Sequence, residues 1–181
     1  MRKSGQVTVF GSSKVSPTEE PYQQALRLGR LLAEAGYAVC SGGYGGVMEA
    51  VSRGAAEAGG TVIGVTMETW SPRLRANPWL SQEVVAPHLF DRMRRLIASD
   101  AYVAMPGGLG TLGEVAVTWN LFQTDSIPVR PLILVGDLWR GFVQYVQREF
   151  RVDGRDAALV RFADTVEEVA PLLRQVIPPT A

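Results

Sequence analysis

The residues best suited to chemistry lie in one glycine-rich stretch, Met105-Pro-Gly-Gly-Leu-Gly-Thr-Leu-Gly-Glu114. An apolar run at residues 101–105 precedes it and is typical of a buried parallel strand, while residues 115–122 have a helical pattern. A glycine-rich turn between a strand and a helix exposes backbone N–H groups at the positive end of the helix dipole. The stretch therefore predicts a site for an anion, most often a phosphate.

Individual residues of this stretch have separate expected roles. Gly107, Gly108 and Gly110 can adopt positive φ and let a ligand approach the backbone closely. Thr111 adds a hydroxyl where the helix is expected to begin, which suits a cap. Glu114 follows one helical turn later, and spacing alone supports two roles equally: a carboxylate that caps the helix, or a catalytic carboxylate that faces a ligand.

Two more loops follow expected strands and contain small or glycine residues. In the first, Ser12 and Ser13 either donate hydrogen bonds to a ligand or cap a turn. In the second, at residues 41–46, Gly43 and Gly46 either hold a phosphate or serve only a tight turn. Ligands of α/β sheets bind beyond the carboxyl ends of the strands, so the three loops are expected to converge on one phosphate site.

Strand and helix patterns alternate along the chain. They predict an α/β fold over residues 1–181: a single-domain, Rossmann-like, doubly wound, mostly parallel sheet with helices on both faces. Residues 67–82 are expected to form a long irregular loop, which in a compact domain is often functional. The expected strands are residues 6–10, 37–40, 61–66, 83–86, 100–105 and 131–135, and the expected helices are residues 18–36, 47–58, 89–98, 111–122, 138–150 and 165–176.

Residues 106–114 are similar to the Pro-Gly-Gly-x-Gly-Thr-x-x-Glu signature of the LONELY GUY family, at every fixed position. The resemblance extends over roughly residues 7–135 and includes residues 9–13, residues 42–48 and Asp100-Ala101. It implies a nucleoside 5'-monophosphate phosphoribohydrolase, which hydrolyses the N-glycosidic bond of AMP or of an N6-substituted AMP such as cytokinin riboside 5'-monophosphate. Related molybdenum-cofactor carrier proteins resemble the signature too, so a non-catalytic carrier of a phosphorylated ligand is the alternative.

The resemblance also assigns roles to side chains outside the signature. It implies that Arg92 acts with Glu114 at the ribose, that no metal or organic cofactor is required, and that the protein forms a homodimer. The family has an Arg-Lys pair here, whereas in this chain Met93 follows Arg92. Arg94 and Arg95 are expected to be solvated or ion-paired, and Asp100 to be structural.

Composition excludes several other classes. With 18 basic and 18 acidic side chains, nothing favours a nucleic-acid or membrane partner. One His and one Cys argue against a metal site with the usual ligands, and Cys40 fits a reducing cytoplasm. Lys3 and Lys14 are the two lysines, and neither has the setting of a Schiff-base lysine, so the label of lysine decarboxylase carried by many relatives does not fit.

Two patterns have further interpretations. Gly108-x-Gly110-x-x-Gly113 matches a dinucleotide fingerprint, with Asp137 as the acid for the ribose, although it lies late in the chain. Large apolar groups on the helix after Glu114, namely Trp119, Leu121 and Phe122, are core residues or part of a dimer interface.

Overall fold

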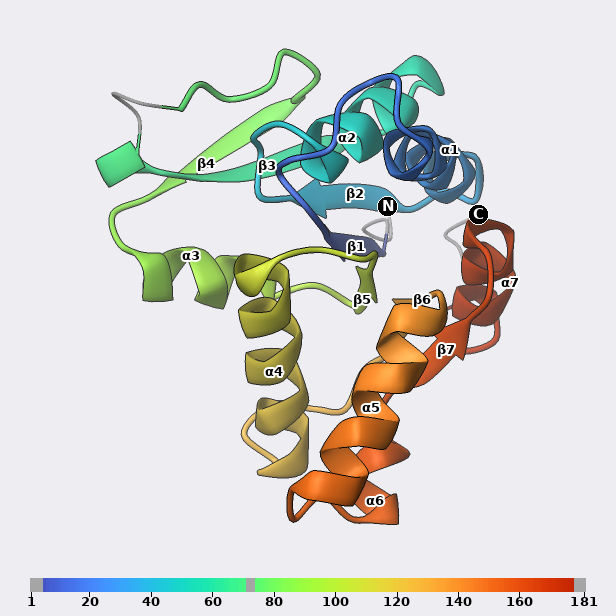
Figure 1. The fold of residues 1–181 in the computed structure, drawn as a ribbon. Helices are drawn as coiled ribbons and strands as arrows, with labels where there is room; N and C mark the ends of the chain where they lie inside the picture. Colours follow the sequence, from blue (N-terminus) through green and yellow to red (C-terminus); the bar gives the residue numbers. More distant parts are fainter. Residues whose placement is uncertain (1–4, 71–73, 178–181) are drawn as a thin grey trace.

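The computed structural model describes residues 5–70 and 74–177. Within these residues seven strands form one sheet in the order β4-β3-β2-β1-β5-β6-β7, and each neighbouring pair is parallel (Figure 1). The predicted α/β, doubly wound fold is confirmed, and the described sheet is wholly rather than mostly parallel. The strands are β1 (Gln6–Phe10), β2 (Ala38–Ser41), β3 (Val62–Met67), β4 (Gln82–Ala86), β5 (Ala101–Ala104), β6 (Leu132–Val135) and β7 (Arg161–Ala163).

Helices cover both faces of the sheet (Figure 1). One apolar cluster joins α1, α2 and α7 to one face, and a second joins α3, α4 and α5 to the other. Side chains alternate along β1, so that Val7 and Val9 enter the first cluster and Phe10 the second. The helices are α1 (Glu20–Glu34), α2 (Val47–Glu57), α3 (Leu89–Leu96), α4 (Leu109–Gln123), α5 (Asp137–Glu149), α6 (Gly154–Ala157) and α7 (Val169–Arg174), with short 3-10 turns η1 (Glu68–Trp70) and η2 (Val166–Glu168).

The strand order reverses between β1 and β5. From β1 the chain moves outward through β2, β3 and β4, and it then returns to the other side of β1 with β5, β6 and β7. The carboxyl ends of β1 and β5 lie side by side, since Phe10 is in register with Ala104. This is the switch point at which open α/β sheets bind ligands, and the predicted loops after β1, β2 and β5 leave the sheet around it.

Three parts of the fold differ from the sequence expectation. β7 and α6 were not predicted, because β7 has only three residues at the sheet edge and α6 has four. The terminal helix expected over residues 165–176 is divided into η2 and α7. The long loop before β4 contains η1, and residues 71–73 of that loop lie outside the described residues.

Helices α1 and α2 pack closely because each has a glycine at the contact. A Cβ added at Gly29 would lie 2.1 Å from the carbonyl oxygen of Val51, and one added at Gly54 would lie 1.8 Å from that of Leu26. No side chain fits in these spaces without separating the helices. The two glycines therefore set the distance between the helices that cover the β1–β2 half of the sheet.

Replacing Gly54 with alanine should lower the free energy of unfolding by about 1–3 kcal/mol, because the new methyl group overpacks the α1–α2 contact. The matched control is Gly141→Ala within α5, where an added Cβ would meet nothing within 4 Å. That change should raise the free energy of unfolding by about 0.5–1 kcal/mol, as alanine favours a helix over glycine. Urea denaturation measures both, and equal effects would contradict the close-packing role of Gly54.

Candidate functional site

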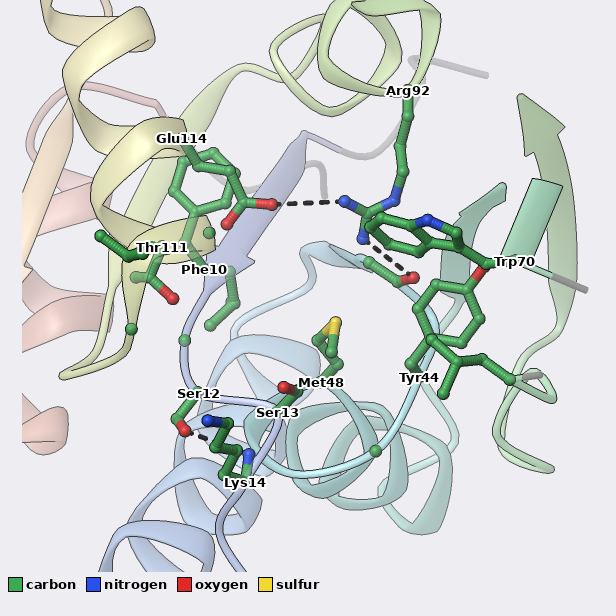
Figure 2. A pocket seen from close by; sticks show the side chains of 18 residues that line it. Phe10, Ser12, Ser13, Lys14, Tyr44, Met48, Trp70, Arg92, Thr111 and Glu114 are labelled. Atoms are coloured by element: carbon green, nitrogen blue, oxygen red, sulfur yellow. Dashed lines mark hydrogen bonds and ion pairs between the residues drawn. The ribbon is translucent and has the colours of Figure 1, made fainter. Parts of the chain in front are cut away.

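A cavity of about 850 Å³ opens at the switch point of the sheet. Its wall comes from the end of β1, the loops after β1 and β2, η1, α3 and the first two turns of α4 (Figure 2). It is lined by Val9, Phe10, Gly11, Ser12, Ser13, Lys14, Gly42, Tyr44, Gly45, Met48, Trp70, Leu74, Arg92, Gly108, Leu109, Gly110, Thr111 and Glu114. The three predicted loops thus contribute to one site.

Arg92 is held rigidly in the wall of this cavity. The residue is 6% exposed, and its Nε donates to the carbonyl oxygen of Val65 at 2.8 Å while Nη2 donates to that of Gly42 at 3.2 Å. The guanidinium also lies over the rings of Tyr44 and Trp70, 5.8 and 5.4 Å from their centroids. A planar cation with carbonyl acceptors and aromatic faces around it has one favoured orientation.

Glu114 faces Arg92 across the cavity wall, with Oε1 3.5 Å from Nη1 (Figure 2). Its side chain is 14% exposed, and this burial raises the pKa of the carboxyl to about 7, although the charge of Arg92 partly opposes the shift. Glu114 lies six positions after Gly108, the N-cap of α4, and so belongs to the second turn. The capping role considered for Glu114 is therefore excluded, since capping groups act within the first turn.

The N-terminus of α4 points its free N–H groups toward the cavity. Its N-cap is Gly108, which offers no side chain, and the first turn contains no acidic residue. An added Cβ at Gly108 or Gly110 would meet nothing within 4 Å, so space remains above the helix end. Thr111 is 3% exposed and lines the cavity, and its hydroxyl makes no hydrogen bond to the residues that the structure describes. These are the features of an anion site at a helix N-terminus.

The same region corrects two expectations. Thr111 is not the helix cap, because α4 begins at Leu109 and the capping position is occupied by Gly108. Gly107, Gly108 and Gly110 do not adopt positive φ. Gly107 is instead required by packing: an added Cβ would lie 2.2 Å from Oγ1 of Thr111, and the residue does not line the cavity.

Ser12 and Ser13 both line the cavity from the loop after β1. The Ser12 hydroxyl accepts a hydrogen bond from the backbone N–H of Lys14 at 3.1 Å, which turns the loop. The Ser12 carbonyl accepts another from Val47 at the start of α2, at 2.8 Å. The structure therefore fixes this loop against α2 and leaves Ser13 exposed.

Gly43 and Gly46 lie behind the cavity wall rather than on its surface, where Gly42 and Gly45 are found. Both adopt positive φ, of 78° at Gly43 and 68° at Gly46. An added Cβ at Gly46 would lie 2.3 Å from the carbonyl oxygen of Ser12. Their structural role is to let the loop after β2 turn sharply against β3 and against the loop after β1.

Sequence reasoning missed the apolar part of the cavity. Phe10, Tyr44, Met48, Trp70 and Leu74 line it, and none was predicted as a site residue. Two signals were present: the long loop expected to be functional contains Trp70 and Leu74, and Met48 follows the second glycine loop. Met48 is half-buried and borders the cavity.

Other candidates lie outside the site. Asp100 pairs with Arg130 at 3.0 Å and accepts from the backbone of Gln6, in line with the expected structural role. Arg94 and Arg95 are exposed, as expected. Asp137 begins α5 and does not line the cavity.

The remaining patterns are explained by the helices. Gly110 and Gly113 of the dinucleotide fingerprint lie inside α4 rather than in a loop. Trp119 and Phe122 are buried in the apolar core, and Trp119 Nε1 donates to the carbonyl oxygen of Asp156 at 2.7 Å. Among the described residues, no helix has both the length and the apolar character needed to cross a membrane.

Known proteins resemble this chain in sequence and in structure. A rice protein (Oryza sativa subsp. japonica) named as a probable cytokinin riboside 5'-monophosphate phosphoribohydrolase is 30% identical over 96% of this chain and 73% of its own length. A cytokinin riboside 5'-monophosphate phosphoribohydrolase of Rhodococcoides fascians is 28% identical over 78% of this chain and 73% of its own. The solved structure of a molybdenum cofactor binding protein from Rippkaea orientalis is similar with a TM-score of 0.78 at 25% identity, over 98% of this chain and 99% of that one.

The protein-family comparison gives the assignment. The sequence model of the SLOG cluster4 family matches residues 4–126, which include the site residues from Ser12 to Glu114. This match and the named relatives confirm the resemblance to the LONELY GUY family that the signature at residues 106–114 indicated. The chain belongs to the SLOG cluster4 family.

Proposed function

We propose that the protein is a nucleoside 5'-monophosphate phosphoribohydrolase, and the observation that carries this proposal is the buried Glu114–Arg92 pair beside an uncapped helix N-terminus. The phosphate would lie at the start of α4, where Gly108, Gly110 and Thr111 line the cavity, with Ser12 and Ser13 close by. The ribose would then reach Glu114, in the next turn of the same helix. No metal or organic cofactor takes part.

The reaction breaks the bond between C1' of the ribose and the base nitrogen. The electron pair leaves with the base, which gains a proton, and the oxygen of water bonds to C1'. Positive charge develops at C1' on the way, and the carboxylate of Glu114 would stabilise it and accept a proton from water. A pKa of about 7 suits this proton transfer, since it lies near the working pH. Arg92 would keep the carboxylate oriented.

The base would occupy the apolar part of the cavity, between Tyr44, Met48, Trp70 and Leu74. Apolar and aromatic walls bind a planar base by stacking and shape. The total volume of about 850 Å³ leaves room for a substituent on the base. The substrate would be AMP or an N6-substituted AMP, in keeping with the names of the rice and Rhodococcoides fascians relatives.

The second candidate function is a carrier of a phosphorylated ligand. It is favoured by the similarity to the molybdenum cofactor binding protein of Rippkaea orientalis and by Met93, which stands where the family has a lysine. A carrier would use the same loops for phosphate and would not turn the ligand over. Phosphate-dependent binding is common to both candidates, so turnover separates them.

A homodimer is part of the proposal. Apolar side chains are exposed beside the cavity at the starts of α3 and α4: Leu89 is 50% exposed, Phe90 86% and Leu109 88%. Water contact with such groups is unfavourable, and a second copy of the chain would cover them. The organisation as a single domain and the cytoplasmic location remain predictions.

Turnover distinguishes the hydrolase from the carrier. Incubation with AMP, and separately with isopentenyladenosine 5'-monophosphate, should release free base, which chromatography detects. The matching nucleosides without phosphate should release none, because the start of α4 would have no anion to bind. Release of no base from either monophosphate by folded protein would refute the hydrolase and leave the carrier as the proposed function.

Glu114→Gln is the matched variant for this assay. It keeps the size of the side chain and removes the carboxylate, so that turnover should fall at least 100-fold, of the order that removing a catalytic acid–base group costs. Binding of the monophosphate, measured by calorimetry, should be retained. A variant with an unchanged rate would remove Glu114 from the mechanism.

The raised pKa of Glu114 also predicts a pH effect on stability. The pKa is about 7 in the folded chain against an ordinary 4.5, so folding favours the protonated carboxyl. This contribution to stability is fully present below pH 4.5 and is lost as the pH rises to 7. Glutamine does not titrate. As the pH rises over this range, the wild type should therefore lose about 3 kcal/mol of its free energy of unfolding relative to Glu114→Gln.

Urea denaturation between pH 4.5 and 8 measures this difference. Using the difference between the two chains cancels the titration of the other groups, and following how this difference changes with pH removes the constant effect of losing the partner of Arg92. A difference that stays constant with pH would show that the pKa of Glu114 is not raised by burial.

The dimer is tested by light scattering on a sizing column. The wild type should have the mass of two chains at micromolar concentration, and Phe90→Asp should shift it toward one, because a charge at a covered apolar position opposes association. The control is Phe150→Asp, at a position that is 61% exposed just after α5. A wild type with the mass of one chain would contradict the proposal.

A further inference from the structure

Lys14 is the charged side chain of the cavity that the proposed mechanism does not use. The charged residues that line the cavity are Lys14, Arg92 and Glu114. Arg92 and Glu114 face each other at 3.5 Å, whereas Lys14 forms no ion pair with any residue in the described part of the chain. Lys14 is exposed and belongs to the loop after β1.

We propose that the Lys14 ammonium group binds the phosphate of the ligand from the side opposite the α4 N-terminus, and so gives the site its selectivity for phosphate-bearing ligands. This inference rests on the proposed function for the identity of the ligand, a 5'-monophosphate. It adds a specificity-determining residue that neither the signature at residues 106–114 nor the site roles above include.

The position of Lys14 is fixed by the packing of its loop. The backbone N–H of Val47 donates to the Ser12 carbonyl at 2.8 Å, and the Lys14 N–H donates to the Ser12 hydroxyl at 3.1 Å. A Cβ added at Gly107 would lie 3.0 Å from the backbone nitrogen of Ser12, so the loop also lies against the loop after β5. The backbone of Lys14 is thereby held at the cavity, while its side chain stays in solvent.

The arrangement of charges around the cavity indicates that Lys14 can bind an anion. Figure 2 shows Ser12, Ser13 and Lys14 gathered at one side of the cavity and Arg92 with Trp70 and Tyr44 at the other, with Thr111 between Glu114 and the loop of Ser12. Arg92 is already surrounded by two carbonyl oxygens, two rings and Glu114. A phosphate monoester has a charge near −2 at neutral pH. At this end of the cavity, the dipole of α4 and Lys14 are the groups that oppose this charge.

An exposed lysine acts as a flexible point charge and is expected to strengthen binding rather than the chemical step. Lys14→Gln should therefore raise KM for AMP about fivefold, as for one exposed ionic contact, and leave kcat within twofold. Lys14→Arg should restore KM. The control is Arg161→Gln, which removes one positive charge from an exposed residue that does not line the cavity and begins the edge strand β7.

A second readout does not depend on turnover. Ribose 5-phosphate is titrated into each chain by calorimetry, with ribose as the ligand that lacks phosphate. The wild type and Arg161→Gln should bind ribose 5-phosphate equally, and Lys14→Gln about fivefold more weakly. Salt should weaken binding less in Lys14→Gln than in the wild type, because one ionic contact has been removed.

The outcomes separate this inference from the proposed function. Hydrolysis of AMP with the same KM in Lys14→Gln and wild type would overturn the role of Lys14 and leave the hydrolase standing. Absence of hydrolysis together with weaker binding of ribose 5-phosphate by Lys14→Gln would overturn the hydrolase and support Lys14 in a carrier. Equal losses in Lys14→Gln and Arg161→Gln would show an effect of net charge alone and overturn the inference.

Discussion

The buried guanidinium of Arg92 is the constraint on which the site depends. An isolated charge in a protein interior is strongly unfavourable, and it persists only where hydrogen bonds and an opposite charge surround it. Here the carbonyl oxygens of Val65 and Gly42 accept its N–H groups, and Glu114 lies opposite. One side chain of α3 thereby connects β3, the loop after β2 and α4, the three elements that surround the Arg92–Glu114 end of the cavity.

Close backbone contacts hold the other end. The loop after β2 reaches the loop after β1 at Gly46, where a Cβ would lie 2.3 Å from the Ser12 carbonyl oxygen, and the loop after β5 reaches it at Gly107. Three loops that leave neighbouring strands are thus packed backbone to backbone. The start of α4 is consequently held in place before any ligand arrives, so that an anion can bind to the fixed dipole without rearrangement of the loops.

The sequence predicted those parts of the structure that depend on local pattern. Alternating apolar runs and helical periods indicated the α/β fold, and glycines directly after the expected strands located the three loops. In the loop after β2 the signal is local, because Gly43 and Gly46 adopt positive φ. The apolar wall could not be predicted in this way. Tyr44, Trp70 and Arg92 come from three separate elements, and their contact depends on the tertiary placement of η1 and α3. The start of α4 was predicted two residues too late, at Thr111 instead of Leu109. Glycine is a weak helix former, so Gly110 did not indicate a helix.

The replacement of the family lysine by Met93 can be judged from this geometry. Adjacent residues of an α-helix point about 100° apart, so Met93 does not share the direction of Arg92 toward Glu114. The contacts of Arg92 are made to main-chain carbonyls and to aromatic rings, and none involves Met93. The pairing with Glu114 therefore does not require a lysine at position 93. What the replacement removes is one positive charge from α3 outside the lining of the cavity, whose cationic lining residues are Arg92 and Lys14.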